Sequence, residues 1–308
     1  MKTKKLFALL LAALMLAALL PACAQSPAAA SFTDMAGREI TLDEPAARVV
    51  AVTPADCEIL YALGAGETLV GRGTYCDWPE AVLELPEVES GQSLNVEQVI
   101  ALKPDVVLMP KMSQTEEQVR ALEDASAHVV VSDAQDIDGV YEAIRLIGTV
   151  TGKEAEAEEL AAGMQQSFAD IEAEATGDGS ETIYFEVSPL EYGLWTAGGN
   201  TFMDELATML GLTNAFADVD GWGEISQEQV IERDPDYIVT ISMYFGEGPT
   251  PEEEILGRAG WQEMKAIKNG AVFNADNNEI ARPGPRLVNA AEALYAFVYE
   301  AMPQGAVA

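Results

Sequence analysis

A unit that combines a helix-like and a strand-like pattern occurs twice in the sequence, 131 positions apart. The first copy, Leu94–Met109, reads LNVEQVIALKPDVVLM, and the second copy, Ile225–Thr240, reads ISQEQVIERDPDYIVT. In both copies Glu-Gln-Val-Ile is followed by Pro-Asp and then by a short apolar run. Chance similarity between two such units is the alternative explanation. A duplicated unit of this kind predicts two lobes built on the same plan.

A weaker echo and a regular alternation of patterns support two lobes. Glu58 and the Leu63-Gly64 step recur as Glu205 and the Leu210-Gly211 step. Strands are expected at Arg48–Thr53, Thr68–Gly71, Asp105–Met109, His128–Val131, Thr182–Val187, Tyr237–Ile241 and Ala271–Asn274. Helices are expected at Ala55–Leu63, Gln114–Ala125, Thr201–Leu210 and from Pro285 to about Glu300. Strands that alternate with helices favour parallel sheets covered on both faces, an α/β fold of two Rossmann-like lobes.

A long helix is expected between the two halves. Residues 153–175 are rich in Ala, Glu and Gln and contain no Pro, and these are strong helix formers. At 1.5 Å per residue the helix would be roughly 35 Å long. A coiled coil is the alternative, but no heptad persists. The expected organisation is a signal peptide at 1–22, a tether at 23–31, an N-terminal lobe at 32–150, an interlobe helix at 151–178 and a C-terminal lobe at 179–308.

The N-terminus has the pattern of an export signal. Met1–Lys5 is basic, and Leu6–Leu20 is an uninterrupted apolar run, shorter than the ~20 residues that a transmembrane helix needs. The ending Leu20-Pro21-Ala22-Cys23 resembles a bacterial lipobox, although Pro21 departs from the usual small or aliphatic residue. We therefore expect Cys23 to carry lipid and to anchor the mature protein outside the cytoplasm, with simple secretion as the alternative.

Charge and composition exclude several classes of function. The chain has 17 Lys and Arg against 51 Asp and Glu, so binding of nucleic acid through phosphate contacts is not expected. His128 is the sole histidine, which removes His-rich metal sites and most triad chemistry. No metal site is expected.

Cys57 and Cys76 each follow an expected strand, so they could form a disulfide in an oxidising compartment or remain buried free thiols.

Aromatic side chains gather where ligands bind in such folds. In α/β sheets, ligands bind beyond the carboxyl ends of the strands. The segments that follow those ends are 53–57, 73–79, 110–113, 188–197 and 242–248. They contain Tyr75, Trp78, Tyr192, Trp195, Tyr244 and Phe245, and Trp222 precedes the second repeat helix. Aromatic rings bury large flat surfaces at a low cost in side-chain entropy, although any one of them could instead pack against its own lobe.

The mature chain resembles the helical-backbone class of substrate-binding proteins of ABC importers, which deliver vitamin B12, ferric siderophores and haem. The resemblance rests on the opening Phe32-Thr-Asp-Met-Ala-Gly-Arg-Glu-Ile, the Leu63-Gly64-Ala65-Gly66 turn, the two repeat units and Arg282-Pro-Gly-Pro-Arg286. Tyr75-Cys76-Asp77-Trp78-Pro79 resembles the Tyr-x-Asp-Tyr-Pro loop of cobalamin-binding members. Gly91 stands where such members carry a Trp.

The resemblance implies a binding protein and not an enzyme. It implies a monomer that holds a bulky ligand, a corrinoid first, between its lobes and delivers it to a dimeric permease. Ligand contacts are expected from Tyr75, Trp78, Trp195, Trp222, Tyr244, Phe245 and Arg282. Arg72 and Arg282 are candidates for polar ligand groups, with structural ion pairs as the alternative. No intrinsic cofactor is implied.

Two glutamates are expected to contact the permease. Asn95-x-x-Gln98 and Ser226-x-x-Gln229 have the pattern of capping boxes, so Glu97 and Glu228 fall in the exposed first turns of the two repeat helices. The helix dipole alone favours acids there. In the resembling family, glutamates at these positions meet arginines of the permease, which gives the two residues a docking role.

Other functions have weaker support in the sequence. A ferric siderophore would need more arginines than the chain offers around the expected cleft, and haem would want an axial His, Tyr or Met, for which Tyr75 or Tyr244 is available. An extracellular α/β enzyme lacks a nucleophile elbow, a P-loop and a dinucleotide-binding fingerprint. A hydrolase that uses a carboxylate pair stays as the distant alternative.

Overall fold

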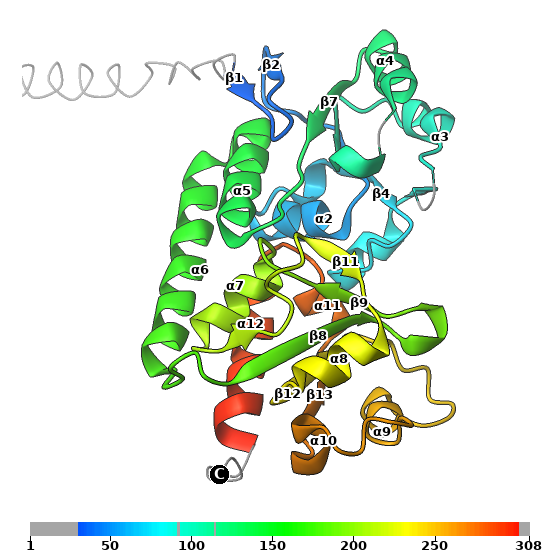
Figure 1. Ribbon diagram of the computed structural model, residues 1–308. Coiled ribbons are helices and arrows are strands. Elements are labelled where there is room, and N and C mark those ends of the chain that lie inside the picture. Colours follow the sequence, from blue (N-terminus) through cyan, green and yellow to red (C-terminus); the bar gives the residue numbers. More distant parts are fainter. Residues whose placement is uncertain (1–29, 91–92, 114, 302–308) are drawn as a thin grey trace, which may run out of the picture.

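Two separate β-sheets, one in each half of the chain, organise the fold (Figure 1). The computed structural model describes residues 30–90, 93–113 and 115–301. The expected signal peptide, Cys23 and Gly91 therefore lie outside the described residues. Ala30 and Ser31 were expected in the tether, but they begin strand β1 (Ala30–Thr33), which pairs with β2 (Glu39–Leu42). Pairing with Leu42 and Thr41 of β2 holds both residues in this hairpin.

The N-terminal sheet is wholly parallel and has the strand order β5-β4-β3-β6-β7. Its strands are β3 (Val49–Ala51), β4 (Leu69–Gly73), β5 (Glu87–Val88), β6 (Val106–Met109) and β7 (His128–Val131). The helices of this lobe are α2 (Pro54–Ala62), α3 (Val96–Ala101), α4 (Glu116–Asp124) and α5 (Ile137–Thr151), with single turns η1 (Gly66–Thr68), η2 (Glu80–Glu84) and η3 (Lys111–Ser113). Val49 and Ala51 enter one apolar cluster and Val50 and Val52 the other. Both faces of the sheet are thus covered, as the apolar runs predict.

The C-terminal sheet has a parallel centre of β10, β8, β12 and β13, as expected, and an antiparallel edge that was not expected. Its order is β11-β9-β8-β12-β13, with β10 also on β8. β9 is antiparallel to β8 and to β11. Only residues 189–194 separate β8 from β9, too few for the crossover that parallel strands require. The strands are β8 (Thr182–Ser188), β9 (Trp195–Ala197), β10 (Thr213–Asn214), β11 (Trp222–Glu224), β12 (Tyr237–Thr240) and β13 (Val272–Asn274).

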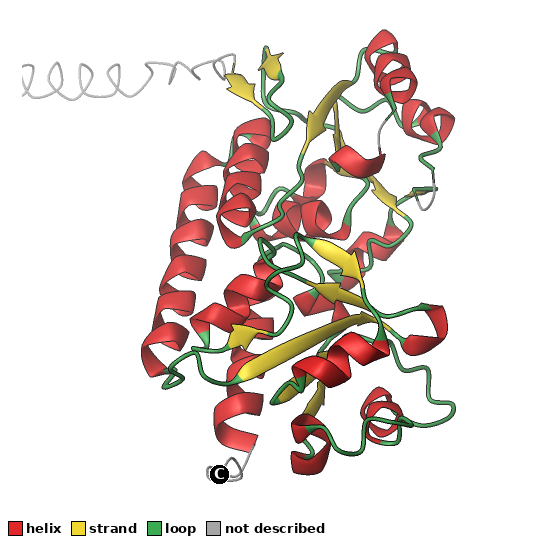
Figure 2. Cartoon of the chain, in the orientation of Figure 1, coloured by secondary structure: helices red, strands yellow, loops and turns green. Residues whose placement is uncertain are grey.

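Helices lie around the strands of the C-terminal sheet (Figure 2). They are α7 (Phe202–Met209), α8 (Gln227–Arg233), α9 (Pro251–Leu256), α10 (Lys265–Asn269), α11 (Asn277–Ile280) and α12 (Leu287–Tyr295), with the turn η4 (Leu190–Tyr192) and the π-helical η5 (Ala296–Ala301). The closing helix expected from Pro285 to about Glu300 is therefore α12 continued by η5.

The repeated unit has the same structure in both lobes. Its helix is α3 in the first copy and α8 in the second, and its strand is β6 or β12, each paired with the first strand of its sheet. Asp105 accepts hydrogen bonds from the backbone N–H groups of Ala47 and Arg48 at 3.0 and 2.8 Å. Asp236 accepts from the backbone N–H and hydroxyl of Thr182 at 2.9 and 3.0 Å. The Pro-Asp signature therefore fixes the start of a central strand in each lobe.

A single long helix, α6 (Glu154–Glu174), runs along one side of both lobes (Figure 1). Its 21 residues correspond to roughly 31 Å, and it packs on α5 of the first lobe and on α7 and α12 of the second. Gly152 separates α5 from α6 with a left-handed φ of 68°, a conformation that glycine adopts without steric cost. The expected interlobe helix is thus present.

Candidate functional site

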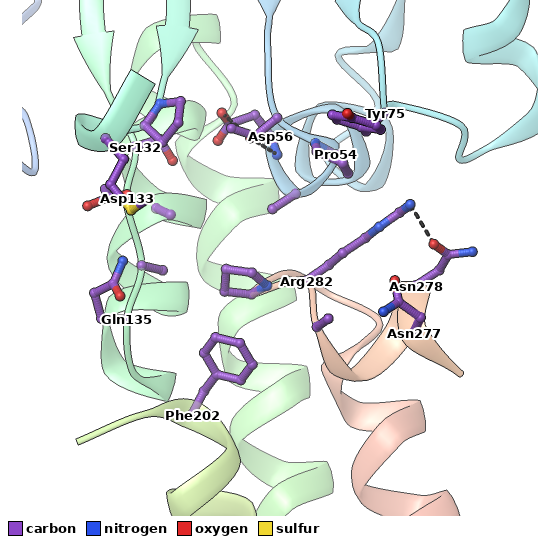
Figure 3. Close-up of a pocket in the computed structure, with 18 of the residues that line it drawn as sticks. Pro54, Asp56, Tyr75, Ser132, Asp133, Gln135, Phe202, Asn277, Asn278 and Arg282 are labelled. Carbon is purple, nitrogen blue, oxygen red and sulfur yellow. Dashed lines mark hydrogen bonds between the residues drawn. The ribbon is translucent and has the colours of Figure 1, made fainter. Parts of the chain in front are cut away.

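A cavity of about 670 Å³ lies between the lobes, at the carboxyl ends of the strands (Figure 3). Its N-terminal wall follows β3, β4, β6 and β7, and consists of Thr53, Pro54, Ala55, Asp56, Thr74, Tyr75, Asp77, Pro110, Met112, Ser132, Asp133, Ala134 and Gln135, with Ala143 of α5. Its C-terminal wall consists of Phe202, Trp222, Met243, Asn277, Asn278, Ala281, Arg282 and Pro283. The first sheet reverses its strand order between β3 and β6, the place where α/β sheets bind ligands.

Three aromatic rings give the cavity flat apolar surfaces. Tyr75 enters from the loop after β4, and Phe202 and Trp222 from the second lobe. The Phe202 and Trp222 rings contact each other with centroids 5.5 Å apart. Trp222 pairs with Ala197 across β11 and β9, and Glu224 pairs with Trp195, so Trp195 lies on the same sheet face as Trp222. Trp195 extends the aromatic surface beyond the cavity wall.

The structure brings part of the predicted ligand set together. Tyr75, Trp222 and Arg282 line the cavity. Trp195 and Trp78 lie next to it, on β9 and in the loop after β4, without lining it. Tyr244 and Phe245 follow Met243 on the loop between β12 and α9, and Phe245 is 85% exposed. The contact roles of these seven residues stay predictions.

Both candidate arginines form structural ion pairs. The Arg282 guanidinium lies 2.6 Å from the Asp77 carboxylate and 3.1 Å from that of Glu58. Arg72 is buried, donates to the carbonyls of Gly73 and Cys76, and pairs with Glu87 at 3.3 Å. Burial alone would raise the pKa of Asp77, but the hydrogen bond and charge of Arg282 hold it below its usual value. Arg282 therefore reaches the cavity already neutralised.

Asp56 places a buried carboxyl at the cavity wall. Its side chain is at the N-terminus of α2, where the Thr53 hydroxyl donates to Oδ2 at 2.6 Å. The residue is 1% exposed. Burial raises the pKa of Asp56 to about 6, opposed by hydrogen bonds from Thr53 and Ser132 and assisted by the nearby charge of Asp133. The charge of this wall thus changes in mildly acidic solution.

Several lining residues were not singled out from the sequence. Phe202 lies in the expected helix Thr201–Leu210, and Met112 and Met243 lie in two of the segments expected after strand ends, but none of the three was named as a contact. Ser132, Asp133 and Gln135 directly follow β7. The rule that ligands bind after strand ends would have found them from the expected strand His128–Val131. Asn277 and Asn278 follow β13 in the same way.

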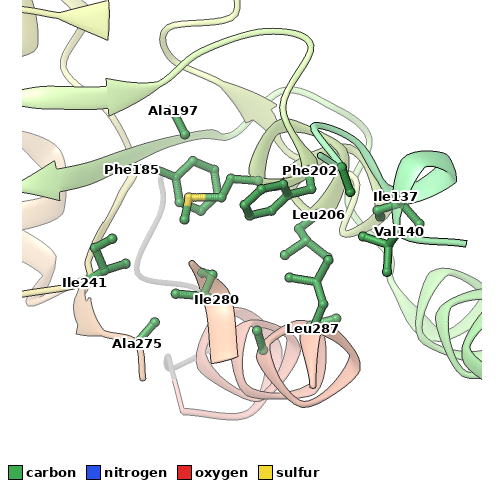
Figure 4. Close-up of a cluster of buried hydrophobic side chains, with 14 of the residues drawn as sticks. Ile137, Val140, Phe185, Ala197, Phe202, Leu206, Ile241, Ala275, Ile280 and Leu287 are labelled. Atoms are coloured by element: carbon green, nitrogen blue, oxygen red, sulfur yellow. The ribbon is translucent and has the colours of Figure 1, made fainter. Parts of the chain in front are cut away.

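Phe202 also joins the cavity to an apolar cluster that runs through both lobes (Figure 4). Ile137 and Val140 of α5 lie beside Phe202 and Leu206 of α7 in this cluster. All four side chains are at most 8% exposed. The lobes are therefore packed against each other by apolar contact at this wall of the cavity.

The two expected docking glutamates occupy equivalent helical positions. Glu97 is exposed in the first turn of α3 and Glu228 in the first turn of α8. Ser226 and Gln229 form the expected capping box. Asn95 caps α3, but the Gln98 side chain accepts from the backbone of Glu89 instead of closing a box. A hydrogen bond with its own backbone N–H and one with Ser226 lower the pKa of Glu228, which keeps it ionised.

Cys57 and Cys76 are buried free thiols, so of the two alternatives left open by the sequence the second holds. Both sulfur atoms lie 3.8 Å from the carbonyl oxygen of Ala51. The two cysteines do meet at one edge of the first sheet, as their positions after two strands predict. A hydrogen bond with Cys76 and burial raise the pKa of the Cys57 thiol, which keeps it protonated.

The described chain, residues 30–90, 93–113 and 115–301, lacks two features. No cluster of three or more His, Cys, Asp or Glu side chains has the arrangement of a metal site there. None of the helices in that part of the chain combines the length and apolarity of a membrane span.

Comparison with known proteins decides the family. The profile of the periplasmic binding protein family matches residues 49–279. The chain belongs to this family. The periplasmic binding protein described here is 33% identical over 272 residues to an uncharacterized ABC transporter substrate-binding lipoprotein, YvrC, of Bacillus subtilis, covering 86% of this chain and 84% of the relative. It is 28% identical over 249 residues to the vitamin B12-binding protein of Pectobacterium carotovorum, covering 80% and 86%.

A solved structure gives the same result. The crystal structure of a possible iron-binding (periplasmic solute-binding) protein from Staphylococcus epidermidis matches with a TM-score of 0.72 and 30% identity, over 83% of this chain and all of that one. This periplasmic binding protein is the substrate-binding component of an ABC transporter, and it works outside the cytoplasm. The role implies a small-molecule ligand and a permease partner. The relatives are solute-binding proteins and not enzymes.

Proposed function

We propose that this periplasmic binding protein captures a corrinoid in the interlobe cavity and delivers it to its permease. The observation that carries the proposal is the character of the cavity wall. Tyr75, Phe202 and Trp222 offer flat apolar surface for a large ring system. Gln135, Asn277 and Asn278 offer amide groups, which can pair with the carboxamide side chains of a corrin.

The charges of the wall support a ligand without net negative charge. Among its described lining residues the cavity has one cation, Arg282, and three carboxylates, Asp56, Asp77 and Asp133. Arg282 is already paired with Asp77 and Glu58. An anionic siderophore or the propionates of haem would find no free positive charge here and would meet like charges. The relative of 28% identity that binds vitamin B12 supports the same choice.

Binding of cyanocobalamin by the purified mature protein tests the proposal. We expect a raised melting temperature, since saturation at a hundredfold excess over Kd adds about 2.7 kcal/mol. Trp222→Ala should weaken binding about tenfold, which is about 1.4 kcal/mol. Tyr192→Ala is the matched control, because Tyr192 is 76% exposed and outside the lining. No response of the wild type to cyanocobalamin would sink the corrinoid proposal.

Iron-containing ligands are the second candidate. Met112 and Met243 line the cavity from opposite lobes, and both side chains are exposed. With Tyr75 they are groups that can serve as axial ligands of haem iron. Hemin and a ferric hydroxamate therefore belong in the same titration. Stabilisation by one of them, with a flat response to cyanocobalamin, would assign the cavity to iron.

Docking to the permease is proposed for Glu97 and Glu228. Their equivalent positions on α3 and α8 place one exposed carboxylate on each lobe, suited to basic groups on the two halves of a dimeric permease. The double variant Glu97→Ala, Glu228→Ala should lose uptake and keep the ligand Kd of the wild type. Glu117→Ala, in the first turn of α4, is the control and should keep both. Weakened ligand binding in the double variant would contradict the docking role.

Anchoring through Cys23 is proposed from the lipobox-like sequence and from the lipoprotein named among the relatives. Cys23→Ser should move the mature protein from the membrane fraction to the medium or periplasm. Retention of that variant in the membrane fraction would contradict lipid attachment.

A further inference from the structure

A buried carboxylate of the first lobe receives two arginines of the second lobe. Glu58 lies on α2, and its side chain is 2% exposed. The guanidinium of Arg286 donates to both carboxylate oxygens, from Nε to Oε2 at 2.9 Å and from Nη2 to Oε1 at 2.7 Å. Arg282 donates to Oε1 at 3.1 Å. Bidentate, charge-assisted bonds of this kind combine strength with a fixed geometry.

The same arginines hold two segments of the cavity wall. Arg282 also donates to Asp77 at 2.6 Å and to the Asn278 side chain at 2.6 Å (Figure 3). Arg286 lies over the Trp78 ring, 4.8 Å from its centroid. The loop that carries Tyr75 and the segment that carries Asn278 are thereby joined across the lobes. We call Glu58, Asp77, Arg282 and Arg286 the interlobe ion cluster.

The opposite side of the cavity has a related contact. Glu205 of α7 corresponds to Glu58 in the weaker echo of the sequence. Its Oε2 accepts from the backbone N–H of Ile137 in the first lobe at 2.6 Å. The backbone N–H of Phe202 donates to the Gln135 carbonyl at 3.0 Å, and both of these residues line the cavity. Equivalent glutamates thus reach across the lobe boundary.

We propose that Glu58 is a positioning residue for the ligand cavity, which fixes the separation of its walls and the place of the Tyr75 loop through Arg282 and Arg286. The proposal rests on the interlobe cavity being the ligand site. Glu58 is the carboxylate of the interlobe ion cluster that both guanidinium groups contact. Among the described residues, loss of the Glu58 charge leaves Arg286 with only the more distant carboxylate of Glu279, at 3.9 Å, so both arginines move toward water. The Tyr75 loop loses its anchor, and the ligand must then order it on binding.

Hydrogen–deuterium exchange of Glu58→Gln tests the positioning role without any ligand. Peptides that cover residues 73–79 and 276–286 should exchange about fivefold faster or more than in the wild type. Glu186→Gln is the matched control, because Glu186 also binds an arginine in bidentate fashion, Arg258 at 2.7 and 3.0 Å, but within one lobe. That variant should leave exchange of the two segments unchanged. Unchanged exchange in a folded Glu58→Gln protein would overturn the proposal.

Affinity for cyanocobalamin gives a second readout. Glu58→Gln should weaken binding about tenfold, and Glu186→Gln should not. If the wild type binds no corrinoid, the proposed ligand is wrong, while the exchange result still decides the role of Glu58. If Glu58→Gln does not fold, Asp77→Asn takes its place in the exchange experiment, because the Asp77 side chain is 48% exposed. Faster exchange of the same two segments supports the proposal, and unchanged exchange contradicts it.

Discussion

At the residue scale, Asp56 differs from the other carboxylates of the cavity. Asp77 is held by Arg282, whereas Asp56 is held by the hydroxyls of Thr53 and Ser132 and lies near the charge of Asp133. Burial outweighs the two hydroxyl hydrogen bonds and, with the charge of Asp133, favours the neutral form of Asp56. The native protein therefore binds a proton at Asp56 at pH values where the unfolded chain has already released it.

This difference predicts a specific pH dependence of stability. The pKa of Asp56 is about 6 in the folded protein and 3.8 in the unfolded chain. The contribution of Asp56 to the free energy of unfolding is therefore fully present below pH 3.8 and is lost as the pH rises through 6. The loss is on the order of 3 kcal/mol. Asp56→Asn should remove this loss. The free energy of unfolding of the variant, measured with urea, should therefore rise relative to that of the wild type between pH 4 and 7.

The control for this prediction has the opposite sign. Burial would raise the pKa of Asp34, but hydrogen bonds from Arg38 and Val131 and the charge of Arg38 lower it. Its stabilisation is present above the unfolded pKa and is lost as the pH falls. Asp34→Asn should therefore be less stable than the wild type by a constant amount above the unfolded pKa of 3.8, and this difference should shrink as the pH falls below 3.8. Parallel pH curves for Asp56→Asn and the wild type would contradict a raised pKa at Asp56.

Sequence could identify part of the site at this scale. Tyr75 was found because it lies in a loop after an expected strand, and Trp222 was found as an aromatic residue that precedes the second repeat helix. Arg282 was found as a motif residue, but its partners Glu58 and Asp77 lie more than 200 positions away in the chain. Ion pairs between such distant residues leave no local pattern, so the interlobe ion cluster could only be seen in three dimensions.

At the element scale, the capping of α8 positions a proposed docking residue. Ser226 accepts from the backbone N–H of Gln229, and the Gln229 side chain accepts from that of Ser226. Ser226→Ala should lower the free energy of unfolding by about 1 kcal/mol, measured by urea titration. Ser226→Thr is the control, since its hydroxyl can accept the same bond. Equal stability of Ser226→Ala and the wild type would show that the cap is dispensable.

Elements with a clear apolar pattern were predicted well, and those without one were not. β7 matches the expected His128–Val131, and β8 and α4 begin or end within two residues of their expected limits. β9 (Trp-Thr-Ala) and β11 (Trp-Gly-Glu) were missed, because neither has the apolar β-branched pattern that marks the equally short β3 and β13. Their pairing with β8 depends on the fold of the whole lobe, which also explains why the second sheet is mixed.

At the scale of the whole molecule, three features resist relative motion of the lobes. α6 packs on both lobes, one apolar cluster spans them, and the interlobe ion cluster joins the cavity walls. Small-angle scattering with and without saturating ligand should therefore give radii of gyration that agree within about 1 Å. A contraction of several ångströms would indicate hinge closure and contradict this expectation.

The two-lobe plan itself followed from the duplicated unit. Asp105 and Asp236 hold equivalent strand starts, and the left-handed residues Lys103 and Asp234 are also 131 positions apart. The repeat did not reveal the apolar contact between the lobes. Residues buried within one lobe and residues buried between the lobes are equally apolar, so the sequence does not distinguish them.

The continuous apolar cluster has a consequence for the folding and unfolding of the molecule. Neither half can be separated from the other without exposing Ile137, Val140, Phe202 and Leu206 to water. Heating should accordingly melt the protein in a single calorimetric transition, and a fragment cut at Gly152 should aggregate. New ligand preferences can arise by exchange of the loops around the gap, while the shared interior must change in both halves together.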